Sequence, residues 1–284
     1  MTSRRPSFVG RSFRNRPIGV FDSGLGGLTV VKALKRVLPR EEIVYLGDTA
    51  RLPYGTKSAE AIQKFSIQDI EFLISRNVKL VIVACHSASS VALDELLKRY
   101  KLPILGVIDP GARAAVEATR NNRIGVIGTN LTIGSGSYER AIRSYRRDVE
   151  IVAKTTPLFV PLAEEGWLNN DVALRAAATY LKPLKTERID TLLLGCTHYP
   201  LLKRVIARTL GSRIRLVDSS EETALSARAL LDRLGLLRTP ATGRRPPTAG
   251  HRFYLSDLSP NFREICSRFL GEPVSDVIRA SIPE

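Results

Sequence analysis

The sequence contains few of the residues that cross-link small secreted proteins or carry a chain through a membrane. Its 284 residues include three cysteines, at positions 85, 196 and 266. An odd number at wide spacing argues against a disulfide framework and fits a reducing cytoplasm. The longest apolar runs, such as LVIVAC (80–85), are far shorter than the ~20 residues that a membrane span needs. We therefore expect a cytoplasmic protein with no membrane partner.

Acidic residues are also scarce. Asp and Glu number 28 against 43 Lys and Arg, which leaves a formal net charge of +15. Such a surplus attracts phosphate polymers, anionic membranes and small acidic substrates alike, so charge does not choose among them. Residues 1–16 contain five arginines, no acidic residue and no apolar segment of the kind that a secretory signal requires. Organelle transit segments share this composition, but we interpret residues 1–16 as a disordered basic tail.

From residue 17 the chain alternates short apolar runs with longer amphipathic stretches. The runs are rich in Ile, Val and Leu, which is typical of strands buried on both faces of a parallel sheet. They lie at 18–21, 42–47, 80–85, 104–108, 123–128, 191–196 and 214–218. Helical spacing of apolar residues is found at 58–76, 89–100, 110–120, 135–147, 171–185, 200–210 and 221–235. This alternation predicts an α/β fold with mostly parallel sheets flanked by helices.

Two parts of the chain repeat each other loosely. IGVFDSGLGGL (18–28) precedes a strand that ends at Cys85, and IGVIGTNLTI (124–133) precedes a strand that ends at Cys196. This repetition predicts two similar lobes. Ligands of open parallel sheets bind beyond the carboxyl ends of the strands. If the lobes face each other, both cysteines converge on one cleft.

Each of these two cysteines has a histidine close by, His86 or His198. A buried free cysteine is most often a small apolar residue, but two cysteines in the same context weaken that interpretation. Three chemistries use this set. A Cys/His nucleophile leaves the second cysteine unexplained. A zinc site would recruit all four residues, and two thiols on opposite faces of a carbon acid would remove a proton and return one from the far side.

Seven stretches together resemble the glutamate racemases, which are cofactor-independent enzymes. They follow the order found in that family and span residues 18 to about 220. The stretches are GVFDSGLGGLTV (19–30), YLGDTARLPYGTKS (45–58), VIVACHSASS (81–90), GVIDPGA (106–112), GVIGTNLTI (125–133), PLFVPLAEEGW (157–167) and LLLGCTHYPLL (192–202). The resemblance implies that D-glutamate is made for peptidoglycan synthesis, and so for cell wall biogenesis and cell shape.

The resemblance also implies roles for particular residues. Cys85 and Cys196 become the two acid/base thiols. Glu164 becomes a supporting residue near the second thiol. The residues that bind or orient the amino acid become Asp22, Ser23, Tyr54, Gly55, His86, Ser87, Thr129, Thr132, Thr197 and His198. Turn formation and helix capping are the structural alternatives for Asp22, Tyr54, Gly55 and the two threonines of the GTNLT turn.

One position departs from the family pattern. Where the family typically has Cys-Asn-Thr, this chain has Cys85-His86-Ser87. Ser87 keeps a hydroxyl group, whereas His86 replaces an amide with an imidazole that can titrate near neutrality. A protonated His86 would strengthen a contact with a substrate carboxylate. The replacement of the usual asparagine by His86 leaves open a racemase for another amino acid, such as aspartate, although Thr197 and His198 fit the glutamate type better.

The remaining features add little chemistry. The DSGLGG and GTKS segments lack the complete nucleotide-binding patterns, and no catalytic lysine setting suggests pyridoxal phosphate, so we expect no cofactor and no metal. We expect Cys266 to be a core residue on an amphipathic helix, Trp167 to pack against other residues and His251 to be exposed to solvent. The family implies a homodimer. A DNA- or gyrase-binding role is the alternative from another class, and the sequence does not favour it because no aromatic-and-basic pattern accompanies the arginines.

We divide the chain accordingly. Residues 1–16 form the tail, 17–108 together with 220–284 the first lobe, and 109–219 the second lobe. Within the first lobe, ATGRRPPTAG (241–250) is expected to be an exposed loop before a possible strand at RFYLS.

Overall fold

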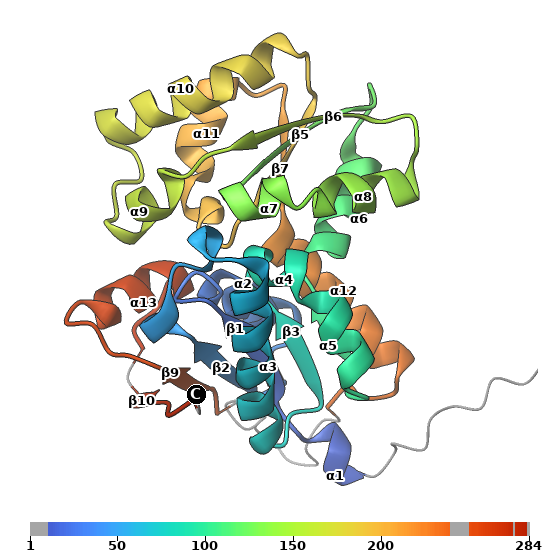
Figure 1. Ribbon diagram of the computed structural model, residues 1–284, viewed down its shortest axis with the longest axis vertical. Coiled ribbons are helices and arrows are strands. Elements are labelled where there is room, and N and C mark those ends of the chain that lie inside the picture. The colour runs from blue at the N-terminus through green and yellow to red at the C-terminus, as the bar shows by residue number, and fades with distance from the viewer. Residues whose placement is uncertain (1–10, 239–249, 275, 283–284) are drawn as a thin grey trace, which may run out of the picture.

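Two sheets, each with helices on its faces, form the two halves of the computed structural model, which describes residues 11–238, 250–274 and 276–282 (Figure 1). The first sheet has the order β10-β9-β2-β1-β3-β4 and the second β6-β5-β7-β8. Every pair of neighbouring strands is parallel. The predicted α/β fold with two parallel sheets is confirmed.

The strands of the first sheet come from both ends of the described chain. They are β1 (Ile18–Asp22), β2 (Ile43–Gly47), β3 (Leu80–Val83), β4 (Ile104–Gly106), β9 (Arg252–Leu255) and β10 (Val277–Arg279). The second sheet holds β5 (Arg123–Gly128), β6 (Glu150–Thr155), β7 (Thr191–Gly195) and β8 (Arg215–Asp218). Strands on the two sides of the proposed lobe boundaries therefore belong to different sheets. The boundaries themselves stay a prediction.

The central strands are apolar because helices cover both of their faces. All residues of β1, β2, β3 and β7 are buried. In contrast, β6 lies at an edge of its sheet and is mostly half-exposed. Its sequence EIVAKT mixes apolar and polar residues, and for that reason the search for apolar runs did not predict it. The three-residue edge strand β10 was not predicted either.

Each of the seven predicted helical stretches overlaps a helix, and other helices were not among them. In chain order from residue 28 the helices are α2 (Leu28–Val37), α3 (Ala59–Ser75), α4 (His86–Val91), α5 (Leu93–Arg99), α6 (Ile108–Ala118), α7 (Asn130–Gly134) and α8 (Ser137–Tyr145). They are followed by α9 (Phe159–Glu164), α10 (Asp171–Thr186), α11 (Lys203–Leu210), α12 (Ser219–Arg233) and α13 (Phe262–Leu270). Helix α12 packs against both α2 and α6, and so joins the two halves of the molecule.

The tail was expected to be disordered up to residue 16, but its last part is folded. Residues 11–14 form the short helix α1 (Arg11–Arg14). The carbonyl oxygen of Arg14 accepts a hydrogen bond of 2.6 Å from Lys79 Nζ, and the Arg16 guanidinium lies over the ring of Phe13. These contacts hold the segment against the first half. Residues 1–10 and 239–249, with most of the predicted 241–250 loop, lie outside the described residues.

Two other expectations meet different outcomes. Cys266 is buried within α13, as its amphipathic pattern predicts. Trp167, expected to pack against other residues, is 47% exposed and follows the end of α9. No helix among the described residues is long and apolar enough to cross a membrane.

Candidate active site

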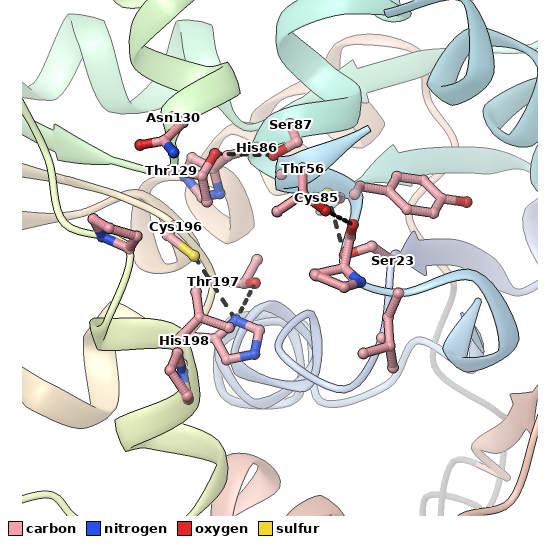
Figure 2. Close-up of a pocket in the computed structure, with 18 of the residues that line it drawn as sticks. Ser23, Thr56, Cys85, His86, Ser87, Thr129, Asn130, Cys196, Thr197 and His198 are labelled. Carbon is pink, nitrogen blue, oxygen red and sulfur yellow. Dashed lines mark hydrogen bonds between the residues drawn. The ribbon is translucent and has the colours of Figure 1, made fainter. Parts of the chain in front are cut away.

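A pocket of about 160 Å³ lies where the carboxyl ends of the two sheets meet. Strands β1 and β3 lead into it from the first half, and β5 and β7 lead into it from the second. Because parallel strands share one direction, the turns that follow them gather at a single edge. Figure 2 shows Cys85 and Cys196 on opposite sides of this pocket. Both cysteines therefore line one pocket, as we expected if the lobes face each other.

Cys85 occupies the turn between β3 and α4. Its Sγ donates a hydrogen bond to Ser23 Oγ at 3.5 Å. Burial, followed by the negative charge of nearby Asp22, raises the pKa of the Cys85 thiol to about 12, against the opposing effect of hydrogen bonds from Ala88 and Ser23. A helix start beside a thiol favours the thiolate, but burial and the carboxylate outweigh this effect at Cys85. Cys85 is therefore a protonated thiol at neutral pH.

Cys196 follows β7 and lies beside a charged pair. Its Sγ is 3.8 Å from His198 Nδ1, and His198 Nε2 is 2.9 Å from Glu164 Oε1. Burial alone would lower the pKa of His198, but the hydrogen bonds and charges of Cys196 and Glu164 raise it to about 10. The rings of His198 and of Phe269 in α13 also meet edge to face, with their centroids 5.0 Å apart. His198 is thus an imidazolium held in place on three sides.

His86 differs from the expectation that it titrates near neutrality. Its side chain is buried, and its Nε2 lies 2.8 Å from Ser219 Oγ. Because the Ser219 hydroxyl donates to the carbonyl of Leu194, it accepts the hydrogen of His86 Nε2. Burial, followed by the positive charge of His198, lowers the pKa of His86 to about 3. His86 is consequently neutral, and its Nδ1 is left as an acceptor without a partner among the described residues.

Glycines let the two halves approach each other around the pocket. A Cβ on Gly26 would lie 2.3 Å from Thr197 Oγ1, and one on Gly55 would lie 3.0 Å from Thr129 Cβ. Close by, Ser87 Oγ and Thr129 Oγ1 are 3.1 Å apart and join α4 to the start of α7. The DSGLGG segment is therefore a packing turn next to the second thiol.

Most of the predicted site residues line the pocket, and Asp22 and Thr132 do not. Asp22 and Thr132 lie behind the pocket wall. Asp22 accepts a 3.0 Å hydrogen bond from the Gly24 amide, and burial raises its pKa. Thr132 accepts a hydrogen bond from Thr129. Tyr54 lines the pocket, but its hydroxyl group points away from it toward Asp48 and Asp69.

The pocket is lined by residues that the sequence indicated and by others that it did not. Those that the sequence did indicate and that line the pocket are Ser23, Tyr54, Gly55, Cys85, His86, Ser87, Thr129, Glu164, Cys196, Thr197 and His198. The missed ones are Gly24, Leu52, Pro53, Thr56, Asn130, Pro157, Val160 and Pro161. Most are apolar or backbone contributors with no chemical signature of their own. Asn130 and Thr56 stand directly beside predicted residues, and that adjacency was the available signal.

A zinc site formed by Cys85, His86, Cys196 and His198 was an alternative interpretation of the sequence. Within the described residues no group of three or more His, Cys, Asp or Glu side chains is arranged to hold a metal ion. His86 points to Ser219, and His198 is bonded to Glu164. Cys85 in turn contacts Ser23, and Cys196 contacts His198.

Comparison with known proteins identifies the family of the chain. The family model described as "Asp/Glu/Hydantoin racemase" matches residues 18–227, which include both cysteines and every residue that lines the pocket. The chain belongs to this racemase family. A curated glutamate racemase from Geobacter metallireducens is 48% identical over 267 residues, covering 94% of this chain and 97% of that protein.

Solved structures of the family share the fold. A glutamate racemase isoform from Bacillus anthracis superimposes with a TM-score of 0.88 at 37% identity, covering 95% of this chain and 99% of that one. The glutamate racemase of Francisella tularensis, solved with D-glutamate, gives a TM-score of 0.87 at 38% identity and covers 95% and 98%. These racemases are isomerases.

Proposed function

We propose that this protein is a glutamate racemase that interconverts L- and D-glutamate with Cys85 and Cys196 as the two acid/base groups. One observation carries the proposal. Two cysteines, each from a different sheet, face one pocket from opposite sides and have unlike electrostatic surroundings. Inversion at Cα needs a base on one face and an acid on the other, and this pocket offers both without a cofactor.

The unlike surroundings distinguish the two thiols. Cys85, whose pKa burial raises to about 12, is the proton donor in the protein without substrate. The imidazolium of His198 stabilises negative charge on Cys196 when that sulfur acts as the base. In the opposite direction the two groups exchange roles, so that each serves as base for one enantiomer and as acid for the other.

Hydroxyl groups and backbone amides near the pocket would hold the amino acid. Ser23 and Thr197 flank the two thiols, while Ser87 and Thr129 lie together at the junction of the halves. Such groups donate to carboxylates, and Asn130 adds an amide that the sequence patterns did not indicate. Neutral His86 can contribute only an acceptor, so it does not strengthen a carboxylate contact by charge.

Glutamate is favoured over aspartate by the relatives. Enzymes called glutamate racemases cover nearly the whole chain at 48% identity and below, and one of them was solved with D-glutamate. We therefore infer that the protein supplies D-glutamate for peptidoglycan synthesis in the cytoplasm. We also infer a homodimer, which light scattering of the purified protein would test.

Proton NMR in D₂O tests the activity directly. With L-glutamate, we expect loss of the Cα proton signal together with formation of D-glutamate on chiral chromatography. Aspartate is the parallel substrate, and a faster reaction with aspartate would assign the alternative specificity. No exchange with either amino acid, from folded protein with reduced thiols, would contradict the proposal.

A DNA- or gyrase-binding role is the second candidate, motivated by the net charge of +15. Binding through phosphate contacts weakens steeply as salt rises, and it does not need the thiols. A salt-dependent shift of DNA by the Cys85→Ala protein would support this role, whereas racemisation would be absent from that variant.

A further inference from the structure

One wall of the pocket is held from behind by a buried cluster of polar side chains. Leu52, Pro53, Gly55 and Thr56 line the pocket. Behind them, the hydroxyl of Tyr54 extends to the carboxyl groups of Asp48 and Asp69, both of which are fully buried. The proton transfers proposed above use neither carboxyl group. These contacts therefore call for another explanation.

Asp48 has the hydrogen bonds of a carboxylate. Its Oδ1 accepts from the hydroxyl of Ser256 at 2.9 Å. Its Oδ2 accepts from Arg51 Nε at 2.6 Å and from the Tyr54 hydroxyl at 2.5 Å. Three donors, one of them a guanidinium, satisfy an ionised group in a buried position.

Asp69, in the middle of α3, has fewer donors. Its Oδ1 is 3.2 Å from Arg51 Nη2, and its Oδ2 is 3.0 Å from the Tyr54 oxygen. A phenol has one hydrogen, and the shorter contact shows that Tyr54 gives it to Asp48. The two oxygens of the longer contact would repel each other with no hydrogen between them. A hydrogen on Asp69 Oδ2 resolves this, because it then donates to Tyr54.

The local charge gives the same answer. The charged or titratable groups that face Asp69 are Asp48, Arg51, Tyr54 and, from β1, Asp22. Arg51 balances Asp48, so an ionised Asp69 would add an uncompensated charge in a fully buried position. Burial, followed by the charge of Asp48, raises the pKa of Asp69 well above its usual range.

We propose that Asp69 is a neutral carboxylic acid that donates a hydrogen bond to the Tyr54 oxygen, and that the hydrogen-bonded chain from Asp69 through Tyr54 to Asp48 positions the pocket wall at residues 52–56. Asp69 is thus a positioning residue, because it touches neither the pocket nor the thiols. Its protonation rests on the contacts above. Its positioning role rests additionally on the proposed racemase function.

Infrared spectroscopy tests the protonation independently of activity. The C=O stretching band of a protonated carboxylic acid is separate from the bands of carboxylates and amides. We expect this band at pH 7 in the wild-type protein and its loss in Asp69→Asn. The exposed Asp94→Asn is the matched control and should keep the band. A wild-type spectrum with no such band, or a band that survives in Asp69→Asn, would overturn the proposal.

Steady-state kinetics test the positioning. The amide of Asp69→Asn can donate to Tyr54 and accept from Arg51, as the neutral acid does. We expect its KM and kcat to stay within about twofold of wild type. Asp69→Ala removes one hydrogen-bond partner of Tyr54 and one of Arg51, and should raise KM about tenfold with a smaller effect on kcat. Equal damage by both variants would show that Asp69 works as a carboxylate. Failure of Asp69→Asn to fold would contradict the proposal as well, since the amide preserves every hydrogen bond.

The pH dependence of Tm also reports on the protonation of Asp69. An acid whose folded pKa is raised stabilises the fold below its unfolded pKa, about 3.9, and this contribution is lost as pH rises toward the folded pKa. The Tm of Asp69→Asn relative to wild type should therefore increase between pH 4 and pH 8. A constant difference over this range would contradict a neutral Asp69.

Discussion

At the scale of single residues, the two thiols of the pocket differ in the charge that stands next to them. Cys85 is close to the buried carboxyl group of Asp22, and Cys196 is close to the imidazolium of His198. A negative neighbour favours the thiol and a positive neighbour favours the thiolate during turnover. The pair is therefore unequal before substrate arrives, and the charge on His198 depends on Glu164.

Glu164→Gln should lower activity although glutamine has the same size and shape as glutamate and keeps the pocket lining. Glutamine still accepts a hydrogen bond from His198 Nε2, but it lacks the charge that helps to raise the pKa of His198 to about 10. We expect kcat/KM to fall on the order of tenfold and the alkaline limb of its pH profile to move to lower pH. Glu165→Gln, an exposed change one residue later, is the control and should behave as wild type. An unshifted limb in Glu164→Gln would contradict the role given to this pair.

The same pair makes a pH-dependent contribution to stability. Because the folded pKa of His198 is raised above its unfolded value of about 6.5, its contribution is complete below pH 6.5 and is lost as pH rises through about 10. Thermal denaturation should thus separate wild type from Glu164→Gln most at pH 6, with the difference shrinking toward pH 10. A difference that grows with pH would contradict the charged state of His198.

At the scale of elements, the start of α7 joins the two halves of the site. Thr129 caps this helix by accepting from the Thr132 amide at 3.2 Å, and it also meets Ser87 of α4. Its hydroxyl therefore has a local and a long-range partner. The GTNLT sequence indicated the cap, but only the fold shows the second contact.

Thr129→Ala removes both contacts. Loss of the cap should cost about 1 kcal/mol of unfolding free energy, and loss of the Ser87 contact should raise the KM for glutamate. Asn170→Ala is a matched control, because Asn170 caps α10 through the Ala173 amide and does not line the pocket. It should lose similar stability in urea denaturation and keep its KM. Equal KM values for the two variants would show that the Thr129 hydroxyl has no part in the site.

Sequence patterns located the elements to the extent that burial is uniform along them. The central strands and the two cysteine turns were predicted, because a fully buried parallel strand and the polar turn after it leave a clear signal. The edge strands β6 and β10 lack that signal. Family resemblance supplied Asp22, Tyr54 and Thr132 as site residues, but the directions of their side chains depend on Asp48, Asp69 and Thr129, which are contacts that no local pattern contains. His86 is similar: its neutrality follows from burial against Ser219.

At the scale of the whole molecule, buried Lys79 ties together separate parts of the chain. Its ammonium group contacts Glu41 Oε2 at 2.5 Å and donates to the carbonyl oxygens of Arg14 and Leu236 at 2.6 and 2.9 Å. It thereby joins the folded end of the basic tail, the segment before β2 and the segment after α12. Lys79 precedes β3, so this cluster lies at the end of the sheet opposite the pocket.

Lys79→Met should destabilise the fold and spare catalysis. Removing one member of a buried ion pair leaves Glu41 uncompensated, which costs about 3–5 kcal/mol. We expect a large fall in Tm with kcat and KM close to wild type well below that temperature. Exposed Lys98→Met is the control and should change neither. An unchanged Tm for Lys79→Met would contradict the tying role.

The central proposal is that racemisation requires two thiols that act from opposite sides of one carbon. The most direct test is racemisation by Cys85→Ala and Cys196→Ala, started from each enantiomer of glutamate and followed by circular dichroism, with the buried Cys266→Ala as control. We predict that each of the first two variants loses at least about a hundredfold of activity in both directions, while Cys266→Ala remains active. Substantial racemisation by either Cys85→Ala or Cys196→Ala would contradict the two-base assignment.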